Sequence, residues 1–372
     1  MAARTAAEPR PQPGATIQDD VILDVEGLST HFRTRDALVR AVNDVSFRVR
    51  RGEILGVVGE SGSGKSVTAR SILGLVPAPG RVVSGAVRFK GRDLLQMAES
   101  ERRQVRGAEI AMVLQEPMTS LNPVLTIGNQ LGEMFTAHPE RAPRSGSVRE
   151  WVADLLGRVR IPDPIARMAQ YPLSFSGGMR QRACIAMGIA CRPDLIIADE
   201  PTTALDVTIQ AQVLHLLSDL RDEFGVSIIL ITHDLGVVAE MCDTVAVMYA
   251  GRIVEYADVD TLFATPRHPY TRALLGSLPR FGGPRLRRQQ TIEGQPPDLS
   301  RPPSGCAFAP RCAQAEDRCH EATPPASPIP SHNGGGSVRC WVVMDELSGI
   351  PGMRIVADGT LAVSAAHLDG GA

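Results

Sequence analysis

The amino-acid sequence predicts an α/β fold with a parallel β-sheet at its centre. Residues 194–200 (DLIIADE) and 226–234 (VSIILITHD) are short apolar runs, and the stretch between them has the composition of a helix. Two such runs joined by a helix form a βαβ unit, whose buried strands are apolar along their whole length. A third apolar run, residues 54–58, leads into a glycine-rich turn at residues 59–66. A strand, a glycine-rich turn and a helix in succession belong to the same kind of fold.

Composition excludes several classes of protein. The chain has 372 residues, of which 43% are hydrophobic, so a disordered or fibrous protein is excluded and a buried core is expected. The formal net charge is -2, whereas proteins that bind nucleic acids normally carry a basic excess. We therefore expect no nucleic-acid partner. No run approaches the roughly 20 apolar residues that span a bilayer, and no signal peptide is recognisable, so we expect a cytosolic protein.

Changes in composition divide the chain into parts. Strand-like runs separated by glycine and charged turns fill residues 21–89, which indicates a strand-rich first lobe. Helical periodicity starts after Leu121, and the segment beyond Arg280 is rich in Pro, Gly and Arg up to a group of cysteines. We predict a disordered tail at residues 1–20, a main domain at 21–262 with a helical subdomain at about 122–176, an extension at 263–345 and a tail at 346–372.

The glycine-rich turn carries a phosphate-binding pattern. Residues 59–66 (GESGSGKS) match G-x-x-x-x-G-K-S/T in the strand-to-helix context that this pattern requires. Its backbone N–H groups and the helix N-terminus attract phosphate groups, Lys65 bridges the β- and γ-phosphates of ATP, and Ser66 holds Mg²⁺. The alternative is a turn that binds nothing. The residues expected to bind the nucleotide are Gly59, Ser61, Gly62, Ser63, Gly64, Lys65 and Ser66.

Two carboxylates stand at the end of the apolar run 195–200. The carboxyl end of a buried strand points at the ligand crevice of an α/β sheet. Asp199 is therefore expected to hold Mg²⁺ through water, and Glu200 to orient or deprotonate the water that attacks the γ-phosphate. Two acids that are simply solvated are the alternative interpretation.

Further motifs resemble those of one family. Residues 175–182 (FSGGMRQR) resemble the signature sequence of ABC-transporter ATPases, although Phe175 and Met179 stand where Leu and Gln are commonest. The resemblance implies a RecA-like core with an antiparallel β subdomain and a helical subdomain. It also assigns roles at the nucleotide to four positions: Gln115 at Mg²⁺ and in catalysis, Asp206 of the D-loop run 204–206, His233 at the γ-phosphate or the attacking water, and Phe32 in stacking on adenine. For Phe32, a place in the core is the alternative.

The signature run predicts a second anion site. Ser176, Gly177 and Gly178 open a helix, so the hydroxyl and the backbone N–H groups are available to an anion. In the family this pocket closes over the γ-phosphate bound to a second ATPase domain. The resemblance therefore implies a head-to-tail dimer that encloses two ATP molecules; a plain capped helix is the alternative.

Two other runs resemble the oligopeptide/dipeptide importer branch of the family. They are residues 115–123 (QEPMTSLNP) and 267–275 (RHPYTRALL). This resemblance implies import of di- or oligopeptides, with nickel and glutathione as the substrates of related importers. It implies two transmembrane permease subunits, an external substrate-binding protein, a second and different ATPase subunit, and a place on the cytoplasmic face of the cell membrane.

The cysteines fall into two groups. Cys184, Cys191 and Cys242 are scattered and are expected in the core. Four others follow the spacing C-x5-C-x6-C-x20-C, which lacks the paired C-x2-C of common zinc sites. Some members of the peptide branch bind a 4Fe-4S cluster at a similar arrangement, so we expect such a cluster, with zinc or reduced thiols as alternatives. The expected ligands are Cys306, Cys312, Cys319 and Cys340, with His320 and His332 in reserve.

Two competing functions differ from a transporter subunit. ABC ATPases of DNA repair, chromosome structure or translation carry coiled-coil insertions, tandem ATPase domains or basic surfaces, and none is recognisable in this sequence. An iron–sulfur redox sensor that merely keeps the fold would have no need of Glu200 or His233. The complete hydrolytic set therefore favours an active ATPase.

Overall fold

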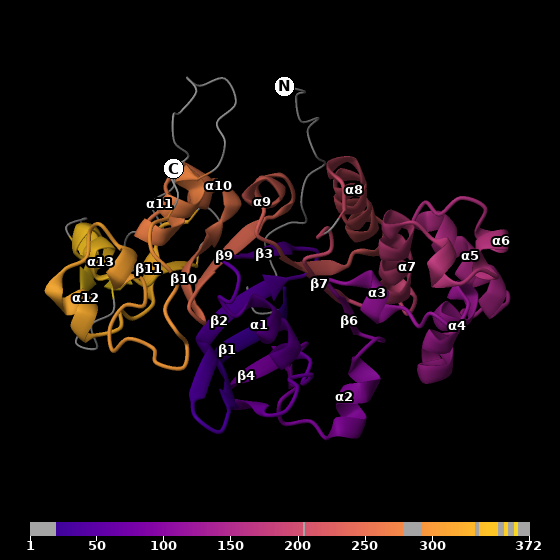
Figure 1. Ribbon diagram of the computed structural model, residues 1–372, viewed down its shortest axis with the longest axis horizontal. Helices are drawn as coiled ribbons and strands as arrows, with labels where there is room; N and C mark the ends of the chain where they lie inside the picture. The colour runs from indigo at the N-terminus through magenta and orange to yellow at the C-terminus, as the bar shows by residue number, and fades with distance from the viewer. Residues whose placement is uncertain are drawn as a thin grey trace.

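A computed structural model describes residues 20–203, 205–277, 292–331, 335–348, 353–355 and 361–363. Three sheets, of eight, four and two strands, and the helices around them make up this part of the chain. Figure 1 shows the larger sheet in the middle of the molecule, the helices α4, α5 and α6 at one end, and the helices α11, α12 and α13 at the other. The predicted tails lie largely outside the described residues.

The larger sheet has the strand order β11-β12-β10-β9-β3-β8-β7-β6. The five strands from β9 to β6 pair in parallel, as the apolar runs of the sequence predict. Every residue of β3, β7, β8 and β9 is buried, because helices or the second sheet cover both faces. The parallel strands are β3 (Ile54–Val58), β6 (Ile110–Val113), β7 (Leu195–Asp199), β8 (Ser227–Ile231) and β9 (Thr244–Tyr249).

The second sheet is antiparallel and forms the strand-rich first lobe that the sequence predicts. Its order is β2-β1-β4-β5, and β1 and β2 have 13 residues each. Its buried side chains share one core with helix α1 (Lys65–Ile72) and with β3. The strands are β1 (Val21–Arg33), β2 (Leu38–Arg50), β4 (Gly80–Phe89) and β5 (Arg92–Asp93).

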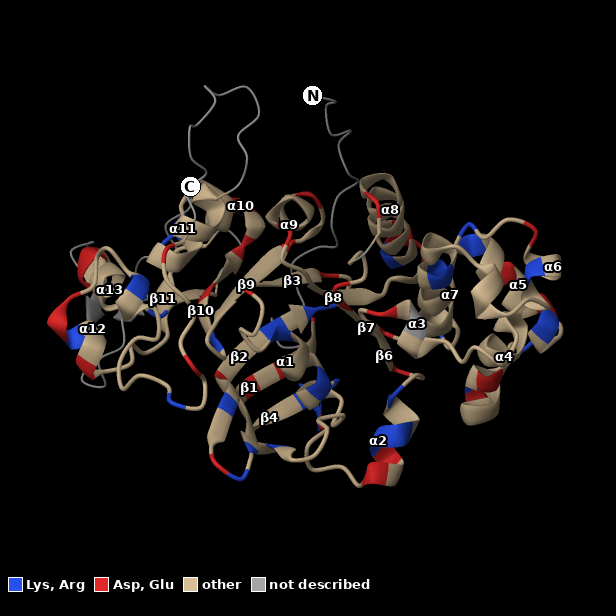
Figure 2. Ribbon diagram, in the orientation of Figure 1, with Lys and Arg blue, Asp and Glu red and all other residues tan. Residues whose placement is uncertain are grey.

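Helices predominate between the first lobe and β7, with strand β6 among them, and the segment from Leu121 to β7 is helical, as predicted. Helix α5 (Val148–Arg158) begins at a capping box, in which Ser147 accepts from the backbone N–H of Glu150 and the Glu150 side chain accepts from that of Ser147. The other helices are α2 (Glu99–Val105), α3 (Pro117–Ser120), α4 (Ile127–Ala137), α6 (Pro164–Met168) and α7 (Gly177–Ile189), with short turns at Pro139–Arg141 and Pro172–Ser174. Figure 2 shows acidic and basic residues side by side on α2.

The rest of the main domain completes the βαβ pattern. Helix α8 (Val207–Phe224) joins β7 to β8, and Gly225 ends it in a left-handed conformation, φ 65°. Helices α9 (Leu235–Met241) and α10 (Val259–Ala264) flank β9 and β10 (Arg252–Asp258). Cys184, Cys191 and Cys242 are buried in the main core, as predicted.

The C-terminal extension continues the main sheet. Strand β12 (Gly336–Val338) pairs with β10, where Glu255 faces Val338, and β11 (Ser327–Ile329) pairs with β12. Buried side chains of the extension also belong to the main core. The boundary that the sequence predicts at residue 263 is therefore crossed by a sheet and by a core. The remaining elements are α11 (Pro269–Gly276), a turn at Ala309–Arg311, α12 (Asp317–Glu321), α13 (Trp341–Ser348), β13 (Met353–Ile355) and β14 (Leu361–Val363).

None of the described helices is both long enough and apolar enough to cross a membrane.

Candidate active site

The phosphate loop connects β3 to α1 in a conformation that only glycine adopts easily. Gly59 has φ 148°, and a Cβ atom there would lie 2.1 Å from the carbonyl oxygen of Met248. Gly64 has φ 105°, and a Cβ atom there would lie 2.4 Å from the carbonyl oxygen of Ala41. Both glycines are therefore required by the close packing of the loop on β9 and β2.

Lys65 lies inside this loop. Its side chain is buried, and Nζ donates to the carbonyl oxygens of Gly59 at 2.8 Å and Glu60 at 3.0 Å. Burial lowers the pKa of the ammonium group, while the charges of Glu200 and Asp199 oppose this shift. The buried hydroxyl of Ser63 has no hydrogen-bond partner among the described residues. A buried ammonium and a free hydroxyl in one glycine-rich loop fit the phosphate groups of ATP.

Two of the three expected Mg²⁺ residues, Ser66 and Asp199, meet at the carboxyl end of β7, whereas Gln115 donates to Glu200. Ser66 Oγ donates to Asp199 Oδ1 at 2.8 Å, although the two residues are 133 positions apart. Burial raises the pKa of Asp199, and the hydrogen bond from Ser66 opposes the rise. A hydroxyl and a carboxylate in contact are hard oxygen ligands of the kind that Mg²⁺ prefers, so the residues present fit this ion.

Glu200 is the point at which the predicted catalytic residues converge. Its carboxylate accepts from Gln115 Nε2 at 3.0 Å and from Thr203 Oγ1 at 2.8 Å, and Nδ1 of His233 lies 3.6 Å from the same oxygen, Oε2. Glu200 has φ 46°, an uncommon conformation outside glycine. Strained backbone of this kind is frequent where a side chain is aimed at a reacting group.

Sequence reasoning missed Thr203. The available signal was a hydroxyl residue three positions after the acid that ends β7, a spacing at which the side chain reaches back to the acid. Ala204, the first residue of the predicted D-loop run, lies outside the described residues.

The signature residues lie at the start of α7. Ser176 caps the helix by accepting from the backbone N–H of Met179 at 3.3 Å. A Cβ atom on Gly178 would lie 2.7 Å from a methyl group of Ile209 on α8, so a glycine is needed for the two helices to approach. Asp206 caps α8 and accepts from Ile209 N at 2.9 Å. Figure 1 shows α7 well apart from α1.

Phe32 lies near the end of β1 and is half-buried. A Cβ atom on Gly80 would lie 2.4 Å from its ring, so the ring packs directly on the start of β4. This contact is a packing contact, and the stacking of Phe32 on adenine stays a prediction.

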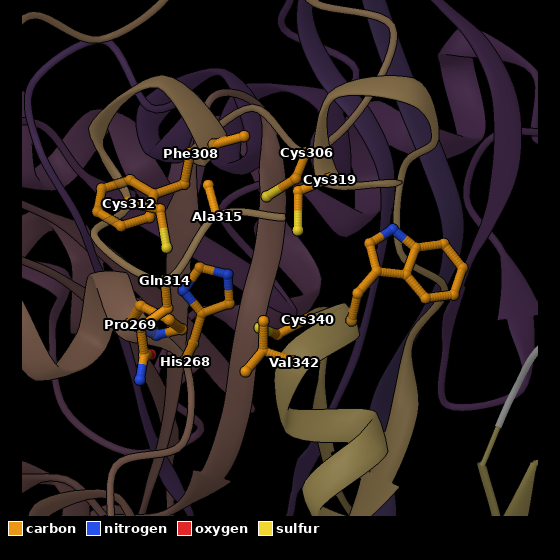
Figure 3. Close-up of a pocket in the computed structure, with 12 residues that line it drawn as sticks. His268, Pro269, Cys306, Phe308, Cys312, Gln314, Ala315, Cys319, Cys340 and Val342 are labelled. Carbon is orange, nitrogen blue, oxygen red and sulfur yellow. The ribbon is translucent and has the colours of Figure 1, made fainter. Parts of the chain in front are cut away.

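The four late cysteines line one small cavity. Cys306, Cys312, Cys319 and Cys340 surround a cavity of about 10 Å³, and Figure 3 shows their sulfur atoms facing the same space. Among the described residues, however, no group of three or more His, Cys, Asp or Glu side chains is placed to hold a metal ion. The structure thus brings the predicted cysteines together, but it does not support the predicted iron–sulfur cluster.

Burial and backbone hydrogen bonds shift the pKa values of three of these thiols in opposite directions. Burial raises the pKa of Cys306, Cys312 and Cys340, the last to about 11. Backbone N–H groups oppose this shift by donating to the sulfur atoms: those of Phe308 and Ala309 to Cys306, that of Gln314 to Cys312, and those of Val342 and Val343 to Cys340. Such donors favour the thiolate form, which is the form that binds metals.

Histidine enters this cavity at a position that the sequence did not suggest. His268, the first residue of the HPY run, is fully buried and lines the cavity (Figure 3). Its Nδ1 accepts a hydrogen bond from the backbone N–H of Tyr270 at 3.0 Å. Of the two ring nitrogens, Nε2 is therefore the one left as a candidate ligand. His320, held in reserve by the sequence, is not among the residues that line the cavity, and His332 lies outside the described residues.

Two family models match the chain. The model described as ABC transporter matches residues 42–203, and the model described as Oligopeptide/dipeptide transporter, C-terminal region, matches residues 254–319. The second match covers the HPY run and three of the four late cysteines.

Full-length relatives are similar over most of the chain. A probable peptide ABC transporter ATP-binding protein of Sinorhizobium fredii is 53% identical over 323 residues, which are 87% of this chain and 95% of the relative. The dipeptide transport ATP-binding protein DppD of Bacillus subtilis is 48% identical over 86% of this chain and 94% of its own length. DppD of Escherichia coli is 46% identical over 87% of this chain and 98% of its own length.

Solved structures share the fold. CbiO1 of Clostridium perfringens, part of the ABC transporter complex cbiONQ, is 27% identical, with a TM-score of 0.56 over 66% of this chain and 92% of its own. The ATP-binding cassette MJ0796, in a dimeric structure bound to ADP and Pi, is 23% identical, with a TM-score of 0.57 over 64% of this chain and 98% of its own.

We predict that Asp199→Asn weakens the Mg²⁺-dependent part of ATP binding by about 10- to 100-fold, the usual cost of losing a group that supports a metal ion. The physical reason is the loss of the carboxylate charge beside Ser66. The measurement is ATP affinity with and without Mg²⁺. Asp194→Asn is the matched control, because Asp194 precedes the same strand and pairs with Lys90. Equal Mg²⁺ dependence in Asp199→Asn and the unmodified chain would contradict the assignment.

Proposed function

Because this chain belongs to the ABC transporter family, among the ATP-binding proteins of peptide importers, we propose that it binds and hydrolyses ATP to power import of di- or oligopeptides across a membrane. One observation carries the proposal: the carboxylate of Glu200 contacts Gln115 and lies beside His233, next to the pair formed by Ser66 and Asp199. A phosphate loop alone supports nucleotide binding. The acid, amide and imidazole beside it add the groups that hydrolysis needs.

The residues divide the work of hydrolysis between them. Lys65 and the loop N–H groups bind the β- and γ-phosphates, while Ser66 and Asp199 hold Mg²⁺, which neutralises charge on the phosphates. Glu200 takes a proton from the attacking water. Gln115 and Thr203 fix the carboxylate through their hydrogen bonds. His233 donates to the γ-phosphate or the water.

The second half of the composite site is proposed to act on a partner. Ser176 and the two glycines that follow open α7, which lies apart from α1 in Figure 1, so they do not face this chain's own phosphate loop. A second ATPase domain in head-to-tail arrangement brings the two halves together. Following the importer branch, we propose a heterodimer with a different ATPase subunit.

Two permease subunits are proposed as membrane partners. A groove of about 330 Å³ is lined by Leu114, the residue before Gln115, and by Met112, Met134 and Met187 among others. Methionine side chains adapt to many shapes, and an apolar groove of this kind suits a short helix from a permease. Gln115 at its edge then links permease movement to Glu200. The chain would act on the cytoplasmic face of the membrane, and an external binding protein would deliver the peptide.

The cysteine cavity is proposed to hold a 4Fe-4S cluster. The donor chemistry fits, because four thiols line one cavity and backbone N–H groups favour the thiolate forms of three of them. The side-chain positions in this structure do not yet gather three ligands around one point. Binding would therefore include a local rearrangement of the cysteine side chains.

We predict that Glu200→Gln lowers ATP hydrolysis by about 10²- to 10⁴-fold, the range for loss of a general base. The variant should still bind ATP and, together with the partner ATPase subunit, should accumulate the closed dimer, because Lys65, Ser66 and Asp199 are unchanged. Phosphate release and size-exclusion chromatography with ATP measure the two effects. Hydrolysis at the rate of the unmodified chain would contradict the assignment of Glu200 as the general base.

We predict that cells lacking this chain lose uptake of labelled di- or oligopeptides, and that the unmodified chain, but not Glu200→Gln, restores it. Uptake of nickel and of glutathione is measured in the same cells. Normal peptide uptake together with lost nickel or glutathione uptake would reassign the substrate to that compound.

We predict that the chain purified without oxygen contains iron and sulfide and is coloured, since thiolate-bound iron–sulfur clusters absorb visible light. Cys312→Ser should lose the iron, whereas Cys184→Ser should keep it because Cys184 is a core residue of α7. Iron and zinc analysis checks the prediction. A colourless protein with stoichiometric zinc, or with no metal, would contradict it.

A further inference from the structure

The C-terminal extension reaches the phosphate loop through one arginine. Arg311 ends the turn Ala309–Arg311, directly before Cys312. Its Nη1 and Nη2 donate to the two carboxylate oxygens of Glu60, at 2.7 and 3.0 Å. Glu60 is the second residue of the phosphate loop. This bidentate pair therefore joins the loop to a residue 251 positions later, in the geometry in which an arginine–carboxylate contact is strongest.

Arg311 is held in place from several sides. Its side chain is only 4% exposed. Besides Glu60 it donates to the Tyr249 hydroxyl at 3.2 Å and to the carbonyl oxygens of Ile292 at 3.2 Å and Glu293 at 2.9 Å. A planar guanidinium group loses little conformational freedom on pairing when hydrogen bonds already orient its N–H groups. The extension thus presents Arg311 to the loop as a preorganised cation.

The HPY run makes a second contact with the same loop residue. The backbone N–H of Glu60 donates to the Tyr270 hydroxyl at 3.0 Å, and Tyr270 is fully buried. Its ring packs against those of Tyr249 and Phe308, with centroid distances of 4.6 and 5.4 Å. The backbone of Glu60 is therefore held by Tyr270 and its side chain by Arg311, and both residues belong to the extension.

The charge of Glu60 makes this contact important for a nucleotide. Its carboxylate is close enough to act on the ammonium of Lys65, and its carbonyl oxygen accepts from Lys65 Nζ. An unpaired anion in a loop that receives polyphosphate would repel the ligand. Arg311 offsets this charge only while the extension is docked.

We propose that Arg311 is a positioning residue of the ATP site: by pairing with Glu60, it makes nucleotide affinity depend on the docking of the cysteine-bearing extension. The inference rests on the ATP-binding function proposed above and adds a residue that lies outside every nucleotide motif of the sequence. Arg311 acts through Glu60, whose charge it neutralises and whose side chain it orients.

The test is a double-mutant cycle on the full chain, with labelled ATP and Mg²⁺ as the probe. Arg311→Gln should raise the Kd for ATP by roughly 5- to 150-fold, the usual span of coupling between two sites. This rise in Kd should be smaller at high salt, because it comes from the unpaired charge of Glu60, which salt screens. In the Glu60→Gln background, the same arginine change should add less than about twofold, since no charge is then left to neutralise. Turnover at saturating ATP should change less than KM.

Two further variants keep the test decisive. Arg311→Lys retains the charge and should bind ATP more tightly than Arg311→Gln. Arg318→Gln is the matched control in the extension, because Arg318 pairs with Glu316 and Asp345 away from the loop, and it should leave Kd unchanged. Thermal unfolding shows whether each variant is folded.

Three results separate the possible failures. A Kd for Arg311→Gln equal to that of the unmodified chain overturns the inference and leaves the proposed function standing. If Arg311→Gln raises the Kd by the same factor in the Glu60→Gln background, the inference is also overturned. The arginine would then act only through docking of the extension, and not through the charge of Glu60. Failure of the unmodified chain to bind ATP removes the proposed function itself.

Discussion

The parallel pairing of β6, β7, β8 and β3 is the constraint on which the site depends. Strands that run in the same direction end at the same edge, so residues far apart in the sequence become neighbours. Each strand ends there at one or two polar residues of the site. The groups are Lys65 and Ser66 after β3, Gln115 after β6, Asp199 and Glu200 at the end of β7, and His233 after β8. Burial of these strands fixes their register, and the register decides which polar residues become neighbours at the edge.

Electrostatics explains why this edge suits a magnesium nucleotide. The structure brings a buried lysine, two adjacent carboxylates and a histidine into one small region, and burial disfavours the charged form of both Lys65 and Asp199. A bound Mg²⁺ and the phosphate groups would compensate both charges together. Glu60, the acid of the phosphate loop itself, already has its compensating cation in Arg311. The C-terminal extension, which adds two strands to the main sheet, is thus also part of the electrostatics of the loop.

Much of this could be predicted from the sequence, because the motif residues are set by short-range patterns. The phosphate loop, the acids at the end of β7 and the helix start at Ser176 all lie where local spacing indicates. Contacts between distant segments could not be predicted. Pairing of β12 with β10, the approach of His268 to the cysteines and the pair Glu60–Arg311 depend on how the extension folds back. The spacing of the cysteines predicted that they come together, but not how far apart their sulfur atoms lie.

The central claim is that the carboxyl edge of the sheet is an ATP site organised around Lys65. The chain has two lysines, which provides a matched pair of variants. Lys90 forms ion pairs with Glu109 and Asp194, which directly precede β6 and β7 and so lie at the amino ends of these strands. The most direct measurement is the Kd for ATP with Mg²⁺ of Lys65→Ala and Lys90→Ala, both shown to be folded. The account predicts a loss of at least about tenfold, or about 1.4 kcal/mol, for Lys65→Ala alone. Equal affinities for the two variants would contradict it.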